Sequence, residues 1–242
     1  MRNHLQSLAV SFFLVTFLSM QFDTKAQEQQ ISSTKPTAEE IRAKSNAEQQ
    51  KKAWEWVSAL GLTDSSKMHI VANAIATHLK TIRDWHNEHP YTTVPAGINP
   101  LTGTKLSDLD RQIIANSAMP RSVHDSLMHL LNRELTPAQV ETVLDKYTIG
   151  KVAFTMAGYK AIVPDLTAEE EAKILGFLKQ AREQAIDYKN MNQISAIFEI
   201  YKTKSEQYLN SNGRSWRHLY KAYTDAIKAK KAAEKQKTST NN

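Results

Sequence analysis

A helix-start motif that occurs three times limits what this chain can fold into more than any other feature. Thr37-Ala-Glu-Glu40, Thr136-Pro-Ala-Gln139 and Thr167-Ala-Glu-Glu170 each place Glu or Gln three residues after Thr. In such a capping box the Thr hydroxyl accepts from the third backbone amide, and the Glu or Gln side chain accepts from the Thr amide. Leu135 and Leu166 precede two of the motifs, as expected for the apolar contact that fixes the entering chain. The sequences diverge after the first turn, so the motifs predict helix starts and no true repeat.

Apolar residues recur every three or four positions behind these starts and between them. Met68, Val71, Ile75 and Leu79, for example, share one face of a helix. No segment of convincing length alternates between apolar and polar residues, as a half-buried strand would. The sequence therefore predicts an all-α fold, a single helical-bundle-like domain of about eight helices with mostly short connections. Helices are expected at about 37–60, 64–87, 107–117 and 121–134, then at 137–147, continued after an interruption at Gly150 by 151–163, and from about 167, 194 and 216 onward.

One expected connection is long and irregular. A helix cannot continue through the segment after Asp84, because it contains Pro90, Pro95, Gly97, Pro100 and Gly103. A loop of about 17 residues in a compact helical domain is unusual and is often functional.

The first 26 residues are typical of a secretory signal peptide. Arg2 and His4 precede an apolar run from Leu8 to Met20, and Ala26 is a fitting small residue at a cleavage point. The run is shorter than the ~20 residues of a comfortable membrane span. We expect residues 1–26 to be removed and the mature protein to be exported, either to the periplasm or to the cell exterior. No later segment has the length of apolar sequence that a membrane span needs.

The composition of the remaining chain predicts three parts. Residues 27–36 are polar and are expected to form a disordered leader, residues 37–232 the helical domain, and residues 233–242 a disordered basic tail. The sequence contains no cysteine, so packing alone must hold this exported fold, and thiolate metal sites are excluded.

The formal net charge is +6, and many of the lysines lie near the C-terminus. Such a basic end can attract an anionic polymer, and it can equally be a solvated helix end. Export argues against nucleic acid as the partner, whereas an oligo- or polysaccharide is compatible with both charge and location. The oligomeric state is not determined by the sequence.

The densest group of candidate binding residues lies where the helix 64–87 meets the long loop. Two aromatic rings there could stack on a sugar ring, and acid, amide and imidazole groups could bond its hydroxyls. The alternative is that the aromatic ring and the first imidazole complete the apolar stripe of their helix and seal the core. The candidate ligand-binding residues are Asp84, Trp85, His86, Asn87, His89, Tyr91 and Asn99.

The histidines do not predict a metal site. His86 and His89 are three residues apart, but Pro90 biases His89 away from helical backbone, and the spacing lacks the Glu of the zinc-protease motif. We therefore expect neither a metal nor a cofactor. The other histidines are scattered and are interpreted as surface or half-buried side chains: His69, His78, His124, His129 and His218.

No catalytic residue is assigned by the sequence. It contains neither a Gly-x-Ser-x-Gly elbow nor a cysteine nucleophile. Tyr159 and Lys160, with Lys151 nearby, could remove a proton next to a uronic carboxylate. A helix-buried Tyr and two exposed lysines need no such role.

Six strings in the second half of the sequence together resemble one protein family. They are Asp145–Val152, Tyr159–Ala161, Val163–Glu170, Ala181–Asp187, Ile200–Lys202 and Gln207–Gly213. The family that they resemble consists of exported bacterial proteins of unknown function, commonly labelled sugar-binding and associated with polysaccharide-degrading bacteria. The resemblance implies a carbohydrate-related role over roughly residues 40–225 but brings no functional residues with it.

Leu135-Thr136-x-x-Gln139 is also similar to a motif of small periplasmic helical chaperones, although an apolar contact with a capping box explains it as well. Three functions follow. The first is an exported protein with a carbohydrate-binding role in polysaccharide utilisation. The alternatives are a lyase or hydrolase acting on acidic plant polysaccharide, and a periplasmic chaperone or envelope-stress protein.

Overall fold

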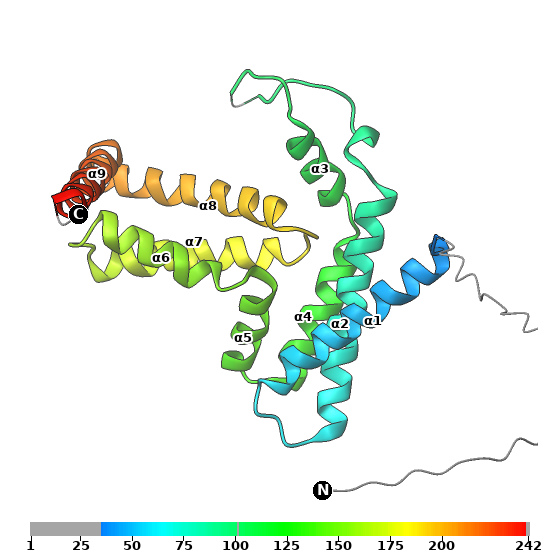
Figure 1. Ribbon diagram of the computed structural model, residues 1–242. Coiled ribbons are helices and arrows are strands. Elements are labelled where there is room, and N and C mark those ends of the chain that lie inside the picture. The colour runs from blue at the N-terminus through cyan, green and yellow to red at the C-terminus, as the bar shows by residue number, and fades with distance from the viewer. Residues whose placement is uncertain (1–34, 101, 241–242) are drawn as a thin grey trace, which may run out of the picture. The chain divides into compact units, whose positions relative to one another are not determined.

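The computed structural model describes residues 35–100 and 102–240, with residues 237–240 described for their backbone alone. The expected signal peptide (1–26) and residues 27–34 of the expected leader lie outside the described residues. Within the described ranges the chain is all-α, as predicted, with nine α-helices, one 3₁₀ turn and no strand (Figure 1). The nine helices are α1 (Ala38–Ser58), α2 (Ser65–Glu88), α3 (Asp108–Ser117), α4 (Arg121–Glu134), α5 (Pro137–Thr148), α6 (Lys151–Ile162), α7 (Ala168–Ala185), α8 (Met191–Ser211) and α9 (Trp216–Thr240).

The capping boxes predicted at Thr136 and Thr167 are confirmed at the starts of α5 and α7. Ser107 and Asp110 form a further capping box at the start of α3. Each box supplies partners for backbone amides that the first helical turn leaves unpaired. These local hydrogen bonds explain why the sequence locates the helix starts well.

The long connection between α2 and α3 is irregular, as expected. It contains a single 3₁₀ turn, Tyr91–Thr93, and an isolated antiparallel bridge between Ile98 and Lys105. Arg111 of α3 donates to the backbone carbonyl of Val94 from both Nε and Nη2, at 2.9 and 2.6 Å. The connection is thereby held against the first turns of α3.

Helices α1, α2, α4 and α5 bury a first core. α1 packs along α2, and α2 packs against α4. Burying an aliphatic side chain of this size contributes about 1.5–3 kcal/mol, so such a core can hold the helices without disulfides. Its fully buried members include Val57, Val71, Ile75, Leu131 and Val143.

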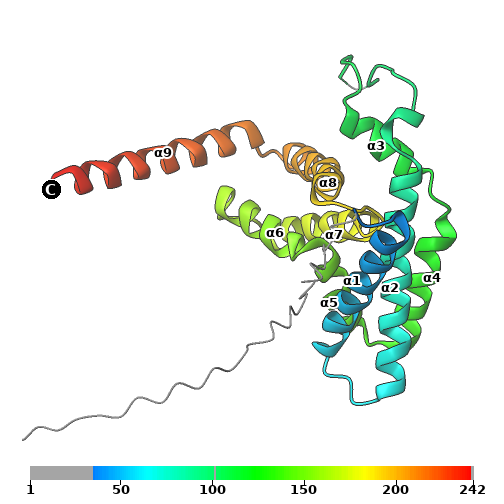
Figure 2. The same cartoon turned by 45° about the vertical axis from the view of Figure 1, so that its right-hand side comes forward.

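Helices α6, α7 and α8 lie side by side (Figure 1) and bury a second core. Trp216 and Leu219 attach the start of α9 to this core. Beyond these turns α9 extends away from the other helices (Figure 2), and its backbone remains helical through residues 233–240. The second core includes Ile174, Leu178, Ile197, Phe198 and Leu209.

The end of α7 and the turn to α8 join the two cores. Ile186 is buried in the first core, whereas Ala185 and Tyr188, its near neighbours in sequence, are buried in the second. One turn earlier, Arg182 donates to Asp145 of α5 at 2.7 Å and also pairs with Glu141 at 2.7 Å. The segment 182–188 is therefore fixed against the first core at several points.

The start of α7 is fixed by a buried ion pair. Glu170 is 4% exposed, and Arg214 donates to its two carboxylate oxygens at 2.7 and 2.8 Å. Those hydrogen bonds lower the pKa of Glu170 from 4.5 to about 2. Because the folded pKa is below the unfolded one, this stabilisation is present above pH 4.5 and is lost as the pH falls towards 2.

We expect Glu170→Gln to lower the free energy of unfolding by about 3 kcal/mol near neutral pH, because Arg214 loses its buried carboxylate. Urea unfolding measures this difference, which should shrink as the pH approaches 2. The control Glu169→Gln, in the same helical turn but exposed, should change stability by less than about 0.5 kcal/mol. Equal losses in both variants, or a loss that does not depend on pH, would contradict the assignment.

Candidate functional site

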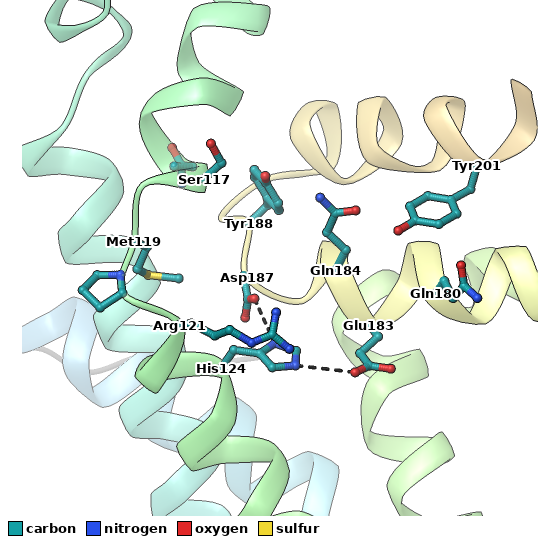
Figure 3. Close-up of a pocket in the computed structure, with 12 residues that line it drawn as sticks. Ser117, Met119, Arg121, His124, Gln180, Glu183, Gln184, Asp187, Tyr188 and Tyr201 are labelled. Atoms are coloured by element: carbon teal, nitrogen blue, oxygen red, sulfur yellow. Dashed lines mark hydrogen bonds and ion pairs between the residues drawn. The ribbon is translucent and has the colours of Figure 1, made fainter. Parts of the chain in front are cut away.

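A cleft of about 590 Å³ lies where the two cores meet (Figure 3). One wall comes from the end of α3 and the start of α4, from Asn116 to His124, and the other from α7, the turn after it and α8. The segment 182–188 that joins the cores thus also forms part of the cleft. Its charged lining residues are Arg121, His124, Glu183 and Asp187, and its amide and aromatic ones include Gln180, Gln184, Tyr188 and Tyr201.

A chain of four hydrogen-bonded side chains runs into this cleft from the first core. The Tyr147 hydroxyl is 3.1 Å from His78 Nδ1, and His78 Nε2 is 3.1 Å from Asp187 Oδ1. The other oxygen of Asp187, Oδ2, is 2.9 Å from His124 Nδ1. The chain therefore links α5, α2, the α7–α8 turn and α4, in that order.

The carboxylate of Asp187 fixes the proton positions along this chain. A carboxylate only accepts, so both imidazoles donate to it, and Nδ1 of His78, when it carries no proton, accepts from the Tyr147 hydroxyl. His124 consequently carries its proton on Nδ1, which leaves Nε2 as the acceptor of the neutral ring. Such an arrangement defines the tautomer of His124 and the orientation of its ring.

Burial and charge shift the pKa values of these groups in opposite directions. Burial acts to raise the pKa of Asp187, but the hydrogen bonds from His124 and His78 outweigh it and lower that pKa below 3.8. The hydrogen bond to Asp187 raises the pKa of His124 above 6.5, against the effect of burial. Burial, with the charge of Asp187, raises the pKa of Tyr188 to about 12. Asp187 is therefore ionised and both tyrosines at the junction are neutral near pH 7, since Tyr147 is shifted upward for the same reasons.

His124 Nε2 faces the cleft side of this network. It lies 3.7 Å from Glu183 Oε1, so the ring stands between two carboxylates (Figure 3). Arg121, one helical turn before His124, is close enough for its charge to oppose protonation of the ring. The arrangement places an oriented imidazole, a carboxylate and a guanidinium at one side of an open cleft.

The sequence of the chain matches the profile of a known protein family. Residues 46–229 match the profile of a family described as "Protein of unknown function (DUF3826)". The chain belongs to this family. No curated protein matches the sequence. In this DUF3826 chain the matched range runs from within α1 to within α9 and contains the whole cleft.

The predicted binding residues at the end of α2 lie beside the cleft and not in its lining. The indole of Trp85 donates to the backbone of Ala115 at 3.1 Å and stacks on His89, with ring centroids 3.8 Å apart. His86 is 3.4 Å from Gln193, and its pKa is lowered by burial and by the charge of Lys189. Trp85 and His86 thus contact the C-terminal end of α3, which forms one wall of the cleft, and support its position.

The remaining predicted residues also have protein partners. Asp84 accepts from Arg42 at 2.9 Å and from Arg83 at 2.8 Å. Asn87 accepts from Lys189 at 2.7 Å and lines a second, smaller hollow of about 360 Å³.

The two predicted residues of the long connection also have protein partners. The Arg111 guanidinium lies over the Tyr91 ring, 5.2 Å from its centroid. Asn99 lies in the long connection, where its backbone bonds Thr104 at 2.8 Å. A ligand role for these seven positions stays a prediction.

The interpretation of two histidines as surface or half-buried was wrong. His78 and His124 are 3% and 8% exposed, because the half-buried carboxylate of Asp187 accepts a hydrogen bond from one ring nitrogen of each. His69, His129 and His218 are exposed, as interpreted. One signal in the sequence did point to burial: His78 lies on the apolar face of α2 between Ile75 and Leu79.

Two kinds of feature are absent from the described part of the chain. Within it, no group of three or more His, Asp and Glu side chains is placed to hold a metal ion. Of the helices in residues 35–100 and 102–240, none combines the length and apolarity needed to cross a membrane.

We expect His124→Gln to destabilise the protein by about 1.5–3 kcal/mol at mildly acid pH, because Asp187 loses a charged hydrogen-bond donor. The raised folded pKa of His124 gives stability that is complete below pH 6.5 and is lost as the pH rises through that pKa. The difference from the wild type should therefore be larger at about pH 6 than at about pH 9. Urea unfolding at both pH values measures it.

His129→Gln is the matched control, since His129 is an exposed residue of the same helix. It should change stability little at either pH. A His124→Gln effect that grows with pH would show that Asp187 does not stabilise the imidazolium.

Proposed function

We propose that this protein binds an oligosaccharide in the cleft between its two cores. The observation that carries the proposal is the pair Gln180 and Gln184 on α7. Both are exposed, both line the cleft, and neither side chain has a hydrogen-bond partner among the described residues. They are four residues apart and so lie on the same face of the helix. A side-chain amide both donates and accepts, which matches a sugar hydroxyl.

The rest of the lining suits the same ligand. Tyr201, half-buried on α8, faces the cleft opposite α7 (Figure 3) and offers an aromatic ring for a sugar face. Glu183 and Arg121 add one charge of each sign. A cleft of about 590 Å³ is of the size that small-molecule sites usually have, about 300–1,000 Å³. The carbohydrate-related role implied by the family resemblance is consistent with this chemistry.

Calorimetry or thermal shift against neutral and acidic oligosaccharides tests the proposal. A ligand at 100 times its Kd should stabilise the protein by about 2.7 kcal/mol. We expect Gln184→Ala to weaken binding by about five- to tenfold, because one to two hydrogen bonds are lost. Gln207→Ala, an exposed Gln of α8 that does not line the cleft, should bind as the wild type does.

A third variant separates the cleft from the site predicted at the end of α2. Tyr91→Ala should leave affinity unchanged if the cleft holds the sugar. Loss of binding in Tyr91→Ala with normal binding in Gln184→Ala would place the ligand at the α2 end instead. A complete absence of binding across the panel would overturn the proposal and favour the chaperone alternative, which suppression of client aggregation would then test.

A further inference from the structure

We propose that the cleft is the active site of a lyase, in which His124 removes a proton beside the carboxylate of a 4-linked uronate oligosaccharide. This inference rests on the proposed saccharide binding and adds a reaction, a substrate class and a catalytic residue to it.

The geometry around His124 is that of an oriented base. Its Nδ1 proton is held by Asp187 at 2.9 Å, so the neutral ring presents Nε2 as acceptor on the side of Glu183 and the cleft. The side chain is 11% exposed, enough for one edge of the ring to meet a ligand while the other is packed. General base catalysis needs both the free nitrogen and the fixed ring.

Asp187 and His78 are positioning residues for this base. The His78 side chain is 2% exposed and holds the second oxygen of Asp187 at 3.1 Å, while Tyr147 holds His78 from behind at 3.1 Å. With both oxygens engaged, the carboxylate cannot rotate without breaking a hydrogen bond. If these hydrogen-bonded side chains only stabilised the fold, the series would not need to end at Nε2 of His124, a nitrogen that solvent can reach.

Arg121 supplies the charge that selects a uronate. Its side chain is 82% exposed and, among the described residues, forms an ion pair with Asp125 alone, at 3.4 Å across one helical turn, so it can turn to a substrate carboxylate at little cost. Neutralising that carboxylate makes the adjacent C–H more acidic. Glu183, whose Oε1 is 3.7 Å from Nε2, then stabilises the imidazolium that proton transfer creates.

The reaction balances with these groups alone. The C5–H bond breaks, its proton moves to His124 Nε2, and its electron pair forms the C4=C5 double bond. The bond between C4 and the glycosidic oxygen breaks, and the leaving oxygen takes the proton back from the imidazolium. No oxidant, reductant or water is consumed. Because one imidazole serves both proton transfers, the C5–H and C4–O bonds must lie on the same face of the sugar ring, as they do in a 4-linked mannuronate and do not in a 4-linked galacturonate.

The pH dependence follows from every charged group that faces His124. Asp187 and Glu183 favour its protonated form, Arg121 opposes it, and His78 reaches it only through Asp187. Because the base must be neutral, turnover should rise with pH through the folded pKa of His124. Asp187→Asn, which removes the hydrogen bond that raises this pKa, should shift the profile to lower pH and reduce kcat.

The experiment incubates the purified protein with oligogalacturonate and oligomannuronate, with a neutral 4-linked galactan oligomer as control. Ultraviolet absorbance reports the new double bond conjugated with the carboxylate, and mass spectrometry shows whether water was added. We expect unsaturated products from oligomannuronate, and none from oligogalacturonate or from the neutral oligomer. His124→Gln should lower kcat by about 10²-fold or more and still bind the probe by calorimetry, whereas His129→Gln should match the wild type.

Arg121→Gln provides a second variant that leaves the fold intact, because its side chain is exposed. It should raise KM for the uronate probe, while Arg133→Gln, also exposed on α4, should not. If His124→Gln fails to fold, as judged by circular dichroism, this pair of variants decides the role of the site.

Five outcomes overturn the inference. Binding of uronates without turnover removes the reaction and leaves the proposed binding function intact. Products that contain added water identify a hydrolase. Full activity in folded His124→Gln would show that His124 is not the base. Unchanged kinetics in Arg121→Gln would show that Arg121 does not bind the substrate carboxylate. If neither turnover nor binding is seen with any probe, the proposed function fails as well.

Discussion

Asp187 accepts a hydrogen bond on each carboxylate oxygen, from His78 of α2 and from His124 of α4. It lies in a turn whose other residues belong to different cores, with Ile186 in the first and Tyr188 in the second. The two cores, the cleft between them and the orientation of His124 all depend on this carboxylate. Burying an ionised group is costly unless it is paired, and here two imidazoles pair it.

The chain has no cysteine, so polar contacts of this kind and apolar packing are all that position its helices. Arg182 ties α7 to α5, and Arg214 holds Glu170 at the other end of α7. α7 is thus fixed at both ends, which keeps its exposed Gln180 and Gln184 in a constant place. A binding cleft benefits from such support, because ordering a loose wall on binding would cost affinity.

The predicted site and the observed cleft are neighbours for a physical reason. The end of α2 carries a dense set of polar and aromatic residues, but the fold uses several of them as braces. Trp85 bonds the α3 backbone, and Lys189 beside Asn87 follows the turn that holds Asp187. In a sequence, a side chain that supports a site looks the same as one that contacts a ligand, since both are polar residues in an otherwise apolar region.

The sequence by itself determined the all-α class, the helix starts at the capping boxes and the irregular connection, because capping, periodicity and proline act over a few residues. The capping boxes at Thr136 and Thr167 are examples. Only the tertiary structure decided which polar residues meet. His78 and Asp187 are 109 positions apart, and no local pattern relates them, since their contact depends on how α2 packs on α4 and where the α7 turn enters the first core. The cleft exists for the same reason, as the space left where two separately formed cores are joined.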